Sequence, residues 1–168
     1  MRPGDRDGWM FRANLRSELG DLQGALSDYT RARALDPPDE ESTLGMRAST
    51  RFRLRDYAGA VEDYAAALRI NPRDGQLFFN CGNARFMAGD LRGAEADYSE
   101  AIRLETSYQL LPQVVREAHL VRARTRERLG DSAGAAEDLR RFLALAPGDP
   151  RAEQARATLE RLAAEDPR

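Results

Sequence analysis

The chain has 168 residues, of which 42% are hydrophobic, 32% charged and 7% aromatic. This length suffices for one domain that buries about 70% of the surface of its unfolded chain, and the composition is too apolar for a disordered chain and too evenly mixed for a membrane protein. The formal net charge of -2 excludes an overall basic field that would attract nucleic acid or an anionic membrane, so neither is an expected partner.

One short sequence pattern returns four times along the chain. It reads GDLQGA from residue 20, RDYAGA from residue 55, GDLRGA from residue 89 and GDSAGA from residue 130. Successive copies therefore start 35, 34 and 41 residues apart. Self-similarity at a period of this size is typical of stacked helical repeats, in which each copy contributes one helical hairpin.

Each copy of the pattern is expected to lie between two helices. The first helices are predicted near residues 6–19, 41–54, 75–88 and 112–129, and the second helices near residues 22–35, 57–70, 91–104 and 132–145. Apolar residues at helical spacing support this assignment, for example Leu91, Ala94 and Tyr98. A last helix near residues 150–164 carries Ala152, Ala155, Leu159 and Leu162 on one side and charges on the other, a pattern that shields the end of a stack from water.

Short carboxylates, prolines and small residues mark the helix ends and junctions. An aspartate that can cap free backbone N–H groups stands just before each second helix: Asp21, Asp56, Asp90 and Asp131. Second helices are followed by Pro37, Pro72 and Pro147, whereas Thr106 stands where a third proline would be. Glycines also fall inside the second helices, where we expect their small size to help packing: Gly24, Gly59, Gly93 and Gly134.

These columns resemble the tetratricopeptide repeat, whose unit is a helix–turn–helix with a period of about 34 residues. The family's tryptophan column is filled by Trp9, Leu44, Phe78 and His119, its second-helix alanine column by Ala25, Ala60, Ala94 and Ala135, and its aromatic column by Tyr29, Tyr64, Tyr98 and Leu139. The resemblance implies an all-α fold, a right-handed α-solenoid of four helix–turn–helix units with a C-terminal capping helix. It implies a single domain over residues 1–168, with repeats at about 6–39, 41–74, 75–108 and 116–149 and the cap at about 150–164.

The same resemblance implies a protein–protein interaction scaffold, not an enzyme, with a partner polypeptide in a concave groove lined by the first helices. The candidate groove residues are Phe11, Asn14, Met46, Ser49, Phe79, Asn80, Asn83, Arg124 and Arg128. The apolar members could hold side chains, and the asparagines carry the donors and acceptors that an extended peptide backbone requires. Arg124 and Arg128 share one helical face, so the peptide end bound there is expected to be acidic.

A chaperone tail is not the expected partner. Some members of the family hold the C-terminal carboxylate of heat-shock chaperones in a clamp of basic and asparagine side chains. The corresponding positions here are Met10, Asn14, Met46, Gln76 and Asn80, and only Asn14 keeps the clamp residue. This departure from the clamp pattern disfavours chaperone-tail binding.

The third junction carries seven extra residues around the run TSYQLLPQVV. Pro112 suits the first turn of a helix, so the insertion is expected to start the next helix early. The apolar residues from Leu110 to Val115 then either pack on the third repeat or form a contact patch. The first repeat has no capping helix comparable to the last one, so its outer face is expected to be open. This open N-terminal face and the patch suggest the alternative function, a structural or oligomerisation module that would make the protein a homo-oligomer.

Arginine and aspartate columns also repeat along the chain. The arginines are Arg16, Arg51, Arg85 and Arg126, and the aspartates are Asp28, Asp63, Asp97 and Asp138. Because neighbouring helices run antiparallel, the spacing predicts that Asp28 meets Arg51, that Asp63 meets Arg85 and that Asp97 meets Arg126. We interpret these pairs as structural links between repeats.

The chain holds one cysteine, Cys81, and one histidine, His119. A lone cysteine cannot form an internal disulfide, and the two residues together fall short of a metal site. Cys81 is expected to be a small buried apolar residue, and His119 to pack between helices. No nucleophile lies with a base and no phosphate-binding loop is present, so we expect no catalytic residue, no cofactor and no metal.

No stretch of the chain approaches 18 consecutive apolar residues, and the sequence MRPGDRDGW at its start lacks the apolar core of a secretory signal. We therefore expect a cytoplasmic protein, unless the chain is a fragment of a longer one. All 26 basic residues are arginine, which indicates GC-rich coding and favours a bacterial source.

Overall fold

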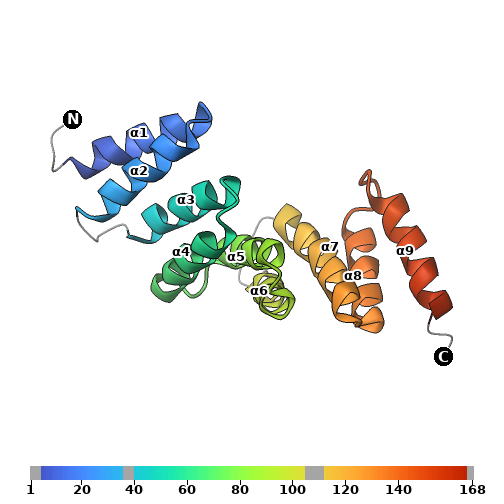
Figure 1. The fold of residues 1–168 in the computed structure, drawn as a ribbon. Helices are drawn as coiled ribbons and strands as arrows, with labels where there is room; N and C mark the ends of the chain where they lie inside the picture. Colours follow the sequence, from blue (N-terminus) through green and yellow to red (C-terminus); the bar gives the residue numbers. More distant parts are fainter. Residues whose placement is uncertain (1–4, 36–39, 105–111, 166–168) are drawn as a thin grey trace.

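The computed structural model describes residues 5–35, 40–104 and 112–165, and these ranges form nine helices and no strand (Figure 1). The helices are α1 (Arg6–Glu18), α2 (Leu22–Arg33), α3 (Glu40–Arg53), α4 (Tyr57–Ile70), α5 (Gly75–Ala88), α6 (Leu91–Leu104), α7 (Pro112–Leu129), α8 (Ser132–Leu145) and α9 (Ala152–Glu165). Helical hairpins follow one another along the stack (Figure 1). The predicted all-α solenoid is confirmed.

Each second helix begins with an aspartate cap, as predicted. Asp21 Oδ1 accepts the backbone N–H of Gly24 at 2.9 Å, and the other three caps repeat this bond at 2.9–3.0 Å. A Cβ atom at Gly24 would lie 2.1 Å from Asp21 Oδ2, and the equivalent glycines have similarly close contacts with their caps. These glycines make room for the cap carboxylate, which corrects the expectation that their small size serves packing between helices.

The turns inside the hairpins use left-handed backbone. Gly20, Gly89 and Gly130 have φ angles of 85°, 88° and 83°. Arg55 holds the equivalent place in the second repeat with a φ of 63°, although its Cβ disfavours this conformation. The second repeat therefore carries backbone strain that glycine avoids in the other three.

The hairpins stack through small side chains and tyrosine rings. The alanine column at the start of the second helices is fully buried. A Cβ atom at Gly82 would lie 2.7 Å from the Tyr98 ring, so the ring packs directly on the backbone of α5. Helices α2, α4 and α6 pack on the first helix of the next hairpin, and α9 packs on α8.

The first helices α3, α5 and α7 lie on the inner side of the stack, and α1 is the equivalent helix of the first hairpin. Helix α3 contacts α5 and α5 contacts α7, whereas no two second helices are in comparable contact within the described residues. In a curved stack the elements on the inner side approach one another most closely. We use the term inner surface for the solvent-facing side of α1, α3, α5 and α7.

The first predicted link between repeats is wrong. Asp28 does not pair with Arg51 of the next repeat; its Oδ2 accepts from Arg12 Nε at 2.7 Å and from Arg16 Nη1 at 2.8 Å. Both arginines belong to α1, which is joined to α2 by a tight turn. The closed hairpin therefore brings them to the aspartate within one repeat, and the buried carboxylate is already matched.

The second and fourth repeats have the same arrangement. Asp63 accepts from Arg47 Nε at 2.8 Å and forms an ion pair with Arg51 Nη1 at 3.0 Å, so its predicted pairing with Arg85 is also wrong. In the fourth repeat, Asp138 is bound by His119, Arg122 and Arg126. In these clusters the aspartate pairs with arginines of its own hairpin; in the fourth repeat, Arg122 and Arg126 also reach across the junction to Ser99 and Glu95 of α6.

The third repeat departs from this arrangement because Cys81 takes the place of the first arginine. Asp97 Oδ1 accepts from Arg85 Nη1 at 2.6 Å, but its Oδ2 is buried without a hydrogen-bond partner. Burial raises the pKa of Asp97 above its ordinary value. The predicted Asp97–Arg126 pair is wrong, since Arg126 Nε reaches across the junction to Glu95 at 2.8 Å. Cys81 is fully buried, as predicted.

Helix α7 begins at Pro112, as the early start predicted. Val114 and Val115 are 8% and 0% exposed, so they belong to the core. This contradicts a contact patch at this part of the Leu110–Val115 run. Leu110 and Leu111 lie outside the described residues, as do Pro37 and Thr106.

Candidate functional site

The nine candidate residues lie along α1, α3, α5 and α7. Phe11, Met46, Ser49, Arg124 and Arg128 are exposed, whereas the other four, Asn14, Phe79, Asn80 and Asn83, are half-buried. Within the described ranges, no hydrogen bond or ion pair joins two of the nine. The orientation of each side chain therefore depends on other residues of its hairpin.

Buried tyrosines orient two of the asparagine amides. Tyr29 donates its hydroxyl proton to Asn14 Oδ1 at 2.5 Å, and Tyr98 donates to Asn83 Oδ1 at 2.9 Å. The tyrosine thus occupies the carbonyl end of each amide. The N–H₂ groups of Asn14 and Asn83 have no partner in the described chain and remain available as donors.

The second repeat places a hydroxyl in the same row. Tyr64 faces Ser49, and burial raises the pKa of Tyr64 to about 12. Burial also raises the pKa of Tyr98 well above its ordinary value. These hydroxyls are protonated at neutral pH, and those of Tyr29 and Tyr98 donate to the row.

The middle of the inner surface combines an aromatic ring with amides. The ring centroid of Phe79 lies 6.0 Å from that of Tyr98, which holds the half-buried phenylalanine against the second helix. Gln76 Nε2 donates to Asn80 Oδ1 at 3.1 Å, so the Asn80 amide is oriented by its own helix. This part of α5 offers apolar area beside hydrogen-bond donors.

The two arginines on α7 differ in what they contact. The Arg128 guanidinium lies over the Phe86 ring, 4.9 Å from its centroid. Arg124 is exposed, and its guanidinium forms no hydrogen bond or ion pair with the described chain. Arg124 is therefore free to bind an anion, whereas Arg128 is already stacked.

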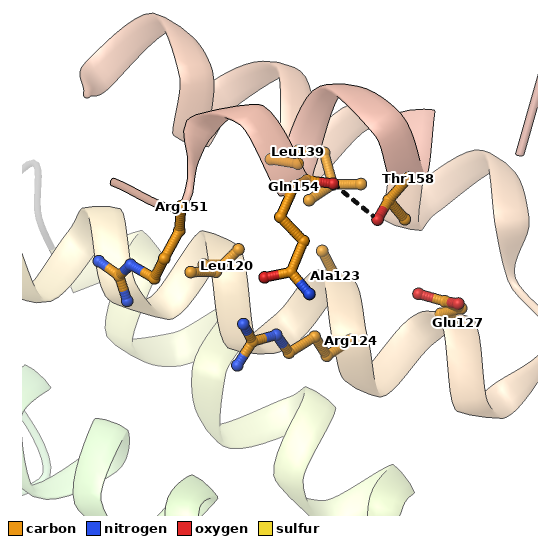
Figure 2. Close-up of a pocket in the computed structure, with 9 residues that line it drawn as sticks. Leu120, Ala123, Arg124, Glu127, Leu139, Arg151, Gln154 and Thr158 are labelled. Atoms are coloured by element: carbon orange, nitrogen blue, oxygen red, sulfur yellow. Dashed lines mark hydrogen bonds between the residues drawn. The ribbon is translucent and has the colours of Figure 1, made fainter. Parts of the chain in front are cut away.

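A cavity of about 210 Å³ lies beside Arg124, between α7 and α9 (Figure 2). Its lining also includes Leu120, Ala123, Glu127, Leu139, Arg151, Gln154, Ala155 and Thr158. Figure 2 shows Gln154 extending from α9 toward Ala123 and Arg124 of α7. The last helix thus covers the end of the stack and also forms one wall of the cavity.

Sequence reasoning identified Arg124 but not Gln154, Leu139 or the tyrosine hydroxyls. The sequence does contain a signal for the asparagine–tyrosine pairs, because the tyrosine follows the asparagine by 15 residues in both the first and the third repeat. At the same spacing, the fourth repeat has Arg124 and Leu139, so both members of the pair change together.

None of the helices described here is long and apolar enough to cross a membrane. In the same ranges, no three or more histidine, cysteine, aspartate or glutamate side chains gather in a way that could hold a metal ion.

Comparison with protein-family models matches the tetratricopeptide repeat at residues 46–109 and again at residues 82–150. No curated protein matches the chain. Among solved structures, the chain is similar to a crystal structure of MamA, with 21% identity over 91% of this chain and 83% of that one and a TM-score of 0.78. A tetratricopeptide repeat protein from Parabacteroides merdae has 18% identity over 96% of this chain and 61% of that one, with a TM-score of 0.83.

A third similar structure is the first TPR of Spaghetti (RPAP3), which was solved bound to the HSP90 peptide SRMEEVD. It has 25% identity over 75% of this chain and 94% of that one, with a TM-score of 0.66. The likeness to all three structures agrees with the helical-repeat fold described above.

Proposed function

The chain belongs to the tetratricopeptide repeat family, and from that premise we propose that it is a non-catalytic scaffold that binds an extended segment of a partner polypeptide on its inner surface. In this function residues 1–168 act as one unit, with four repeats followed by a capping helix.

The observation that carries this proposal is the row of oriented amides. An extended peptide presents backbone carbonyl oxygens that require donors, and the N–H₂ groups of Asn14 and Asn83 are donors without a partner in the described chain. Phe11, Met46 and Phe79 add apolar area along the same helices for alternate side chains of the peptide.

The similar TPR structure bound to a peptide supports a polypeptide partner in general terms. Its HSP90 peptide is not proposed for this chain, because only Asn14 keeps a residue of the chaperone clamp and Met10 and Met46 stand at clamp positions. A different partner sequence, bound through its backbone, fits the inner surface better.

The test uses peptides selected from a random display library against the whole chain. Asn83→Asp keeps an oxygen that accepts from Tyr98 but replaces the N–H₂ donors with a carboxylate, which repels peptide carbonyls. We expect affinity for selected peptides to fall by about tenfold or more, as for losing a buried hydrogen bond, with an unchanged melting temperature. Gln23→Glu, an equal change in charge at an exposed position on α2, should leave affinity unchanged. Equal affinities for parent and Asn83→Asp would refute binding at this surface.

A second candidate function, self-association, is favoured by the open face of α1. Leu15 is 45% exposed, whereas the residues at its place in later repeats, Thr50, Ala84 and Thr125, are 2%, 0% and 0% exposed because the preceding hairpin covers them. Phe11 and Leu19 continue the apolar stripe at 72% and 77% exposure. Light scattering over a range of protein concentrations tests this alternative by measuring the molar mass. A dimer of the parent chain that is absent in Leu15→Glu supports self-association, whereas a monomeric parent chain eliminates it.

A further inference from the structure

The fourth repeat differs from the others at the two positions that meet on the inner surface. Where the first and third repeats pair an asparagine with a tyrosine hydroxyl, the fourth has Arg124 and Leu139. Leucine has no hydroxyl to bind the neighbouring polar group and ends short of the space that a tyrosine ring fills. The exchange therefore leaves the guanidinium without a partner and opens the cavity of about 210 Å³.

The cavity has an apolar floor, and its other lining residues are polar or charged: Arg124, Glu127, Arg151, Gln154 and Thr158. Leu120, Ala123, Leu139 and Ala155 supply the apolar part of the lining. Gln154 on α9 extends toward Arg124 on α7 (Figure 2), and neither side chain has a partner within the described ranges. Such a site suits a ligand with a charged end and a short aliphatic stem.

The charged residues around the cavity favour a ligand that carries a single negative charge. Arg151 binds Glu117 and Asp149, and Arg116 lies 3.8 Å and 3.9 Å from the same two carboxylates. The bond from Arg151 lowers the pKa of Glu117, which keeps that carboxylate ionised at neutral pH.

At the other end of the opening, Glu127 is matched by Arg161. One positive charge, that of Arg124, is therefore left over. A carboxylate balances it, whereas a phosphate dianion would bring excess negative charge close to Glu127 and Glu117.

We infer that this cavity is a recognition site for a glutamate side chain of the partner polypeptide. The glutamate carboxylate is held by Arg124 and Gln154, and its two methylene groups lie on the floor formed by Leu120 and Leu139. The inference rests on the proposed function, because the peptide that carries the glutamate runs along the inner surface. It also gives α9 a binding role in addition to covering the end of the stack.

A small probe tests the cavity without a partner peptide. Sodium butyrate reproduces the glutamate side chain, and butyramide has the same shape without the charge. In NMR titrations of the whole chain, butyrate should shift the Arg124 Nε–H and Gln154 amide signals with a dissociation constant on the order of 10 mM. Butyramide should bind at least about tenfold more weakly.

Two variants make this titration decisive. Arg124→Gln removes the free charge, and Leu139→Tyr restores the ring present in earlier repeats and fills the cavity, so each should abolish the butyrate shifts. Arg156→Gln removes the same charge from an exposed place on α9 that does not line the cavity, and it should leave the shifts unchanged. Equal shifts with butyramide, or unchanged shifts in Arg124→Gln, would overturn the inference.

Selected peptides then separate this inference from the proposed function. Replacing the anchoring glutamate of a selected peptide with glutamine should weaken binding about tenfold to the parent chain but less than about twofold to Arg124→Gln. Peptides that depend on Asn83 but not on Arg124 would refute the glutamate site and leave the proposed function intact. Butyrate binding without any selectable peptide would refute the proposed function and still support a carboxylate site.

Discussion

Replacing one buried aspartate at a time with asparagine should show how differently the second and third repeats hold their charges. Asp63 is 4% exposed, accepts from Arg47 Nε at 2.8 Å and forms an ion pair with Arg51 Nη1 at 3.0 Å. Arg47 is itself only 5% exposed. Asp63→Asn therefore leaves a buried guanidinium unmatched, which should lower the free energy of unfolding by about 3–5 kcal/mol.

Asp97→Asn should cost much less. The Asp97 carboxylate has one arginine partner, Arg85 at 2.6 Å, and its Oδ2 is already buried without a hydrogen bond. Arg85 keeps contact with the Asp90 carboxylate and the Gly93 carbonyl after the change. We expect a loss below about 1 kcal/mol, because the variant gives up one charged hydrogen bond and also removes an unfavourable buried charge.

Urea unfolding at pH 7, followed by far-ultraviolet circular dichroism, measures both values through the midpoint and the slope m. Because neighbouring repeats can unfold separately, amide hydrogen exchange should accompany it and locate the loss in α3 and α4 for Asp63→Asn. Equal losses for the two variants, or a larger loss for Asp97→Asn, would refute the assignment of charge partners within each repeat.

Three further predictions follow from single positions. Arg55→Gly should raise the free energy of unfolding by about 1 kcal/mol in thermal melts, because glycine accepts the φ of 63° without strain; a lower melting temperature would contradict this. Gly82→Ala should lower it by about 1–3 kcal/mol, because the new Cβ would overlap the Tyr98 ring; an unchanged urea midpoint would show that the ring moves aside freely. The pKa of Asp138 is lowered because hydrogen bonds from His119 and Arg122 outweigh the effect of burial. The ionised carboxylate therefore stabilises the fold fully above the ordinary pKa of 3.8, and this stabilisation is lost as the pH falls through the lowered pKa. The urea midpoints of the parent and Asp138→Asn should converge at acid pH, and midpoints that diverge would contradict the sign of the shift.

The helices and their caps could be predicted from sequence because their causes are local. The repeated pattern fixed the period, and a carboxylate three residues before a helical N–H, as in Asp21 and Gly24, needs no information about the rest of the chain. The partner of a charged residue is harder to predict, because spacing along the sequence leaves more than one oppositely charged residue within reach. Asp28 could pair with Arg16 in its own hairpin or with Arg51 in the next one. The tight turn between α1 and α2 brings Arg16 to Asp28, and these two residues form the ion pair.

The candidate site shows the same division. That Asn83 and Arg124 share a row followed from the repeat, but the orientation of the Asn83 amide depends on a hydroxyl supplied by Tyr98 in the second helix. The cavity beside Arg124 further depends on where α9 packs, since Gln154 reaches it from the end of the stack. No local pattern in the sequence encodes that placement.

The most direct test of the central claim is to locate a bound peptide on the protein. A nitroxide spin label on a selected peptide broadens NMR signals of nearby protein amides, and the label should affect α3, α5 and α7 while sparing α2, α4 and α8. A control with the reduced, diamagnetic label should restore every signal. Broadening centred on the second helices, or on the open face of α1 alone, would contradict binding along the inner surface.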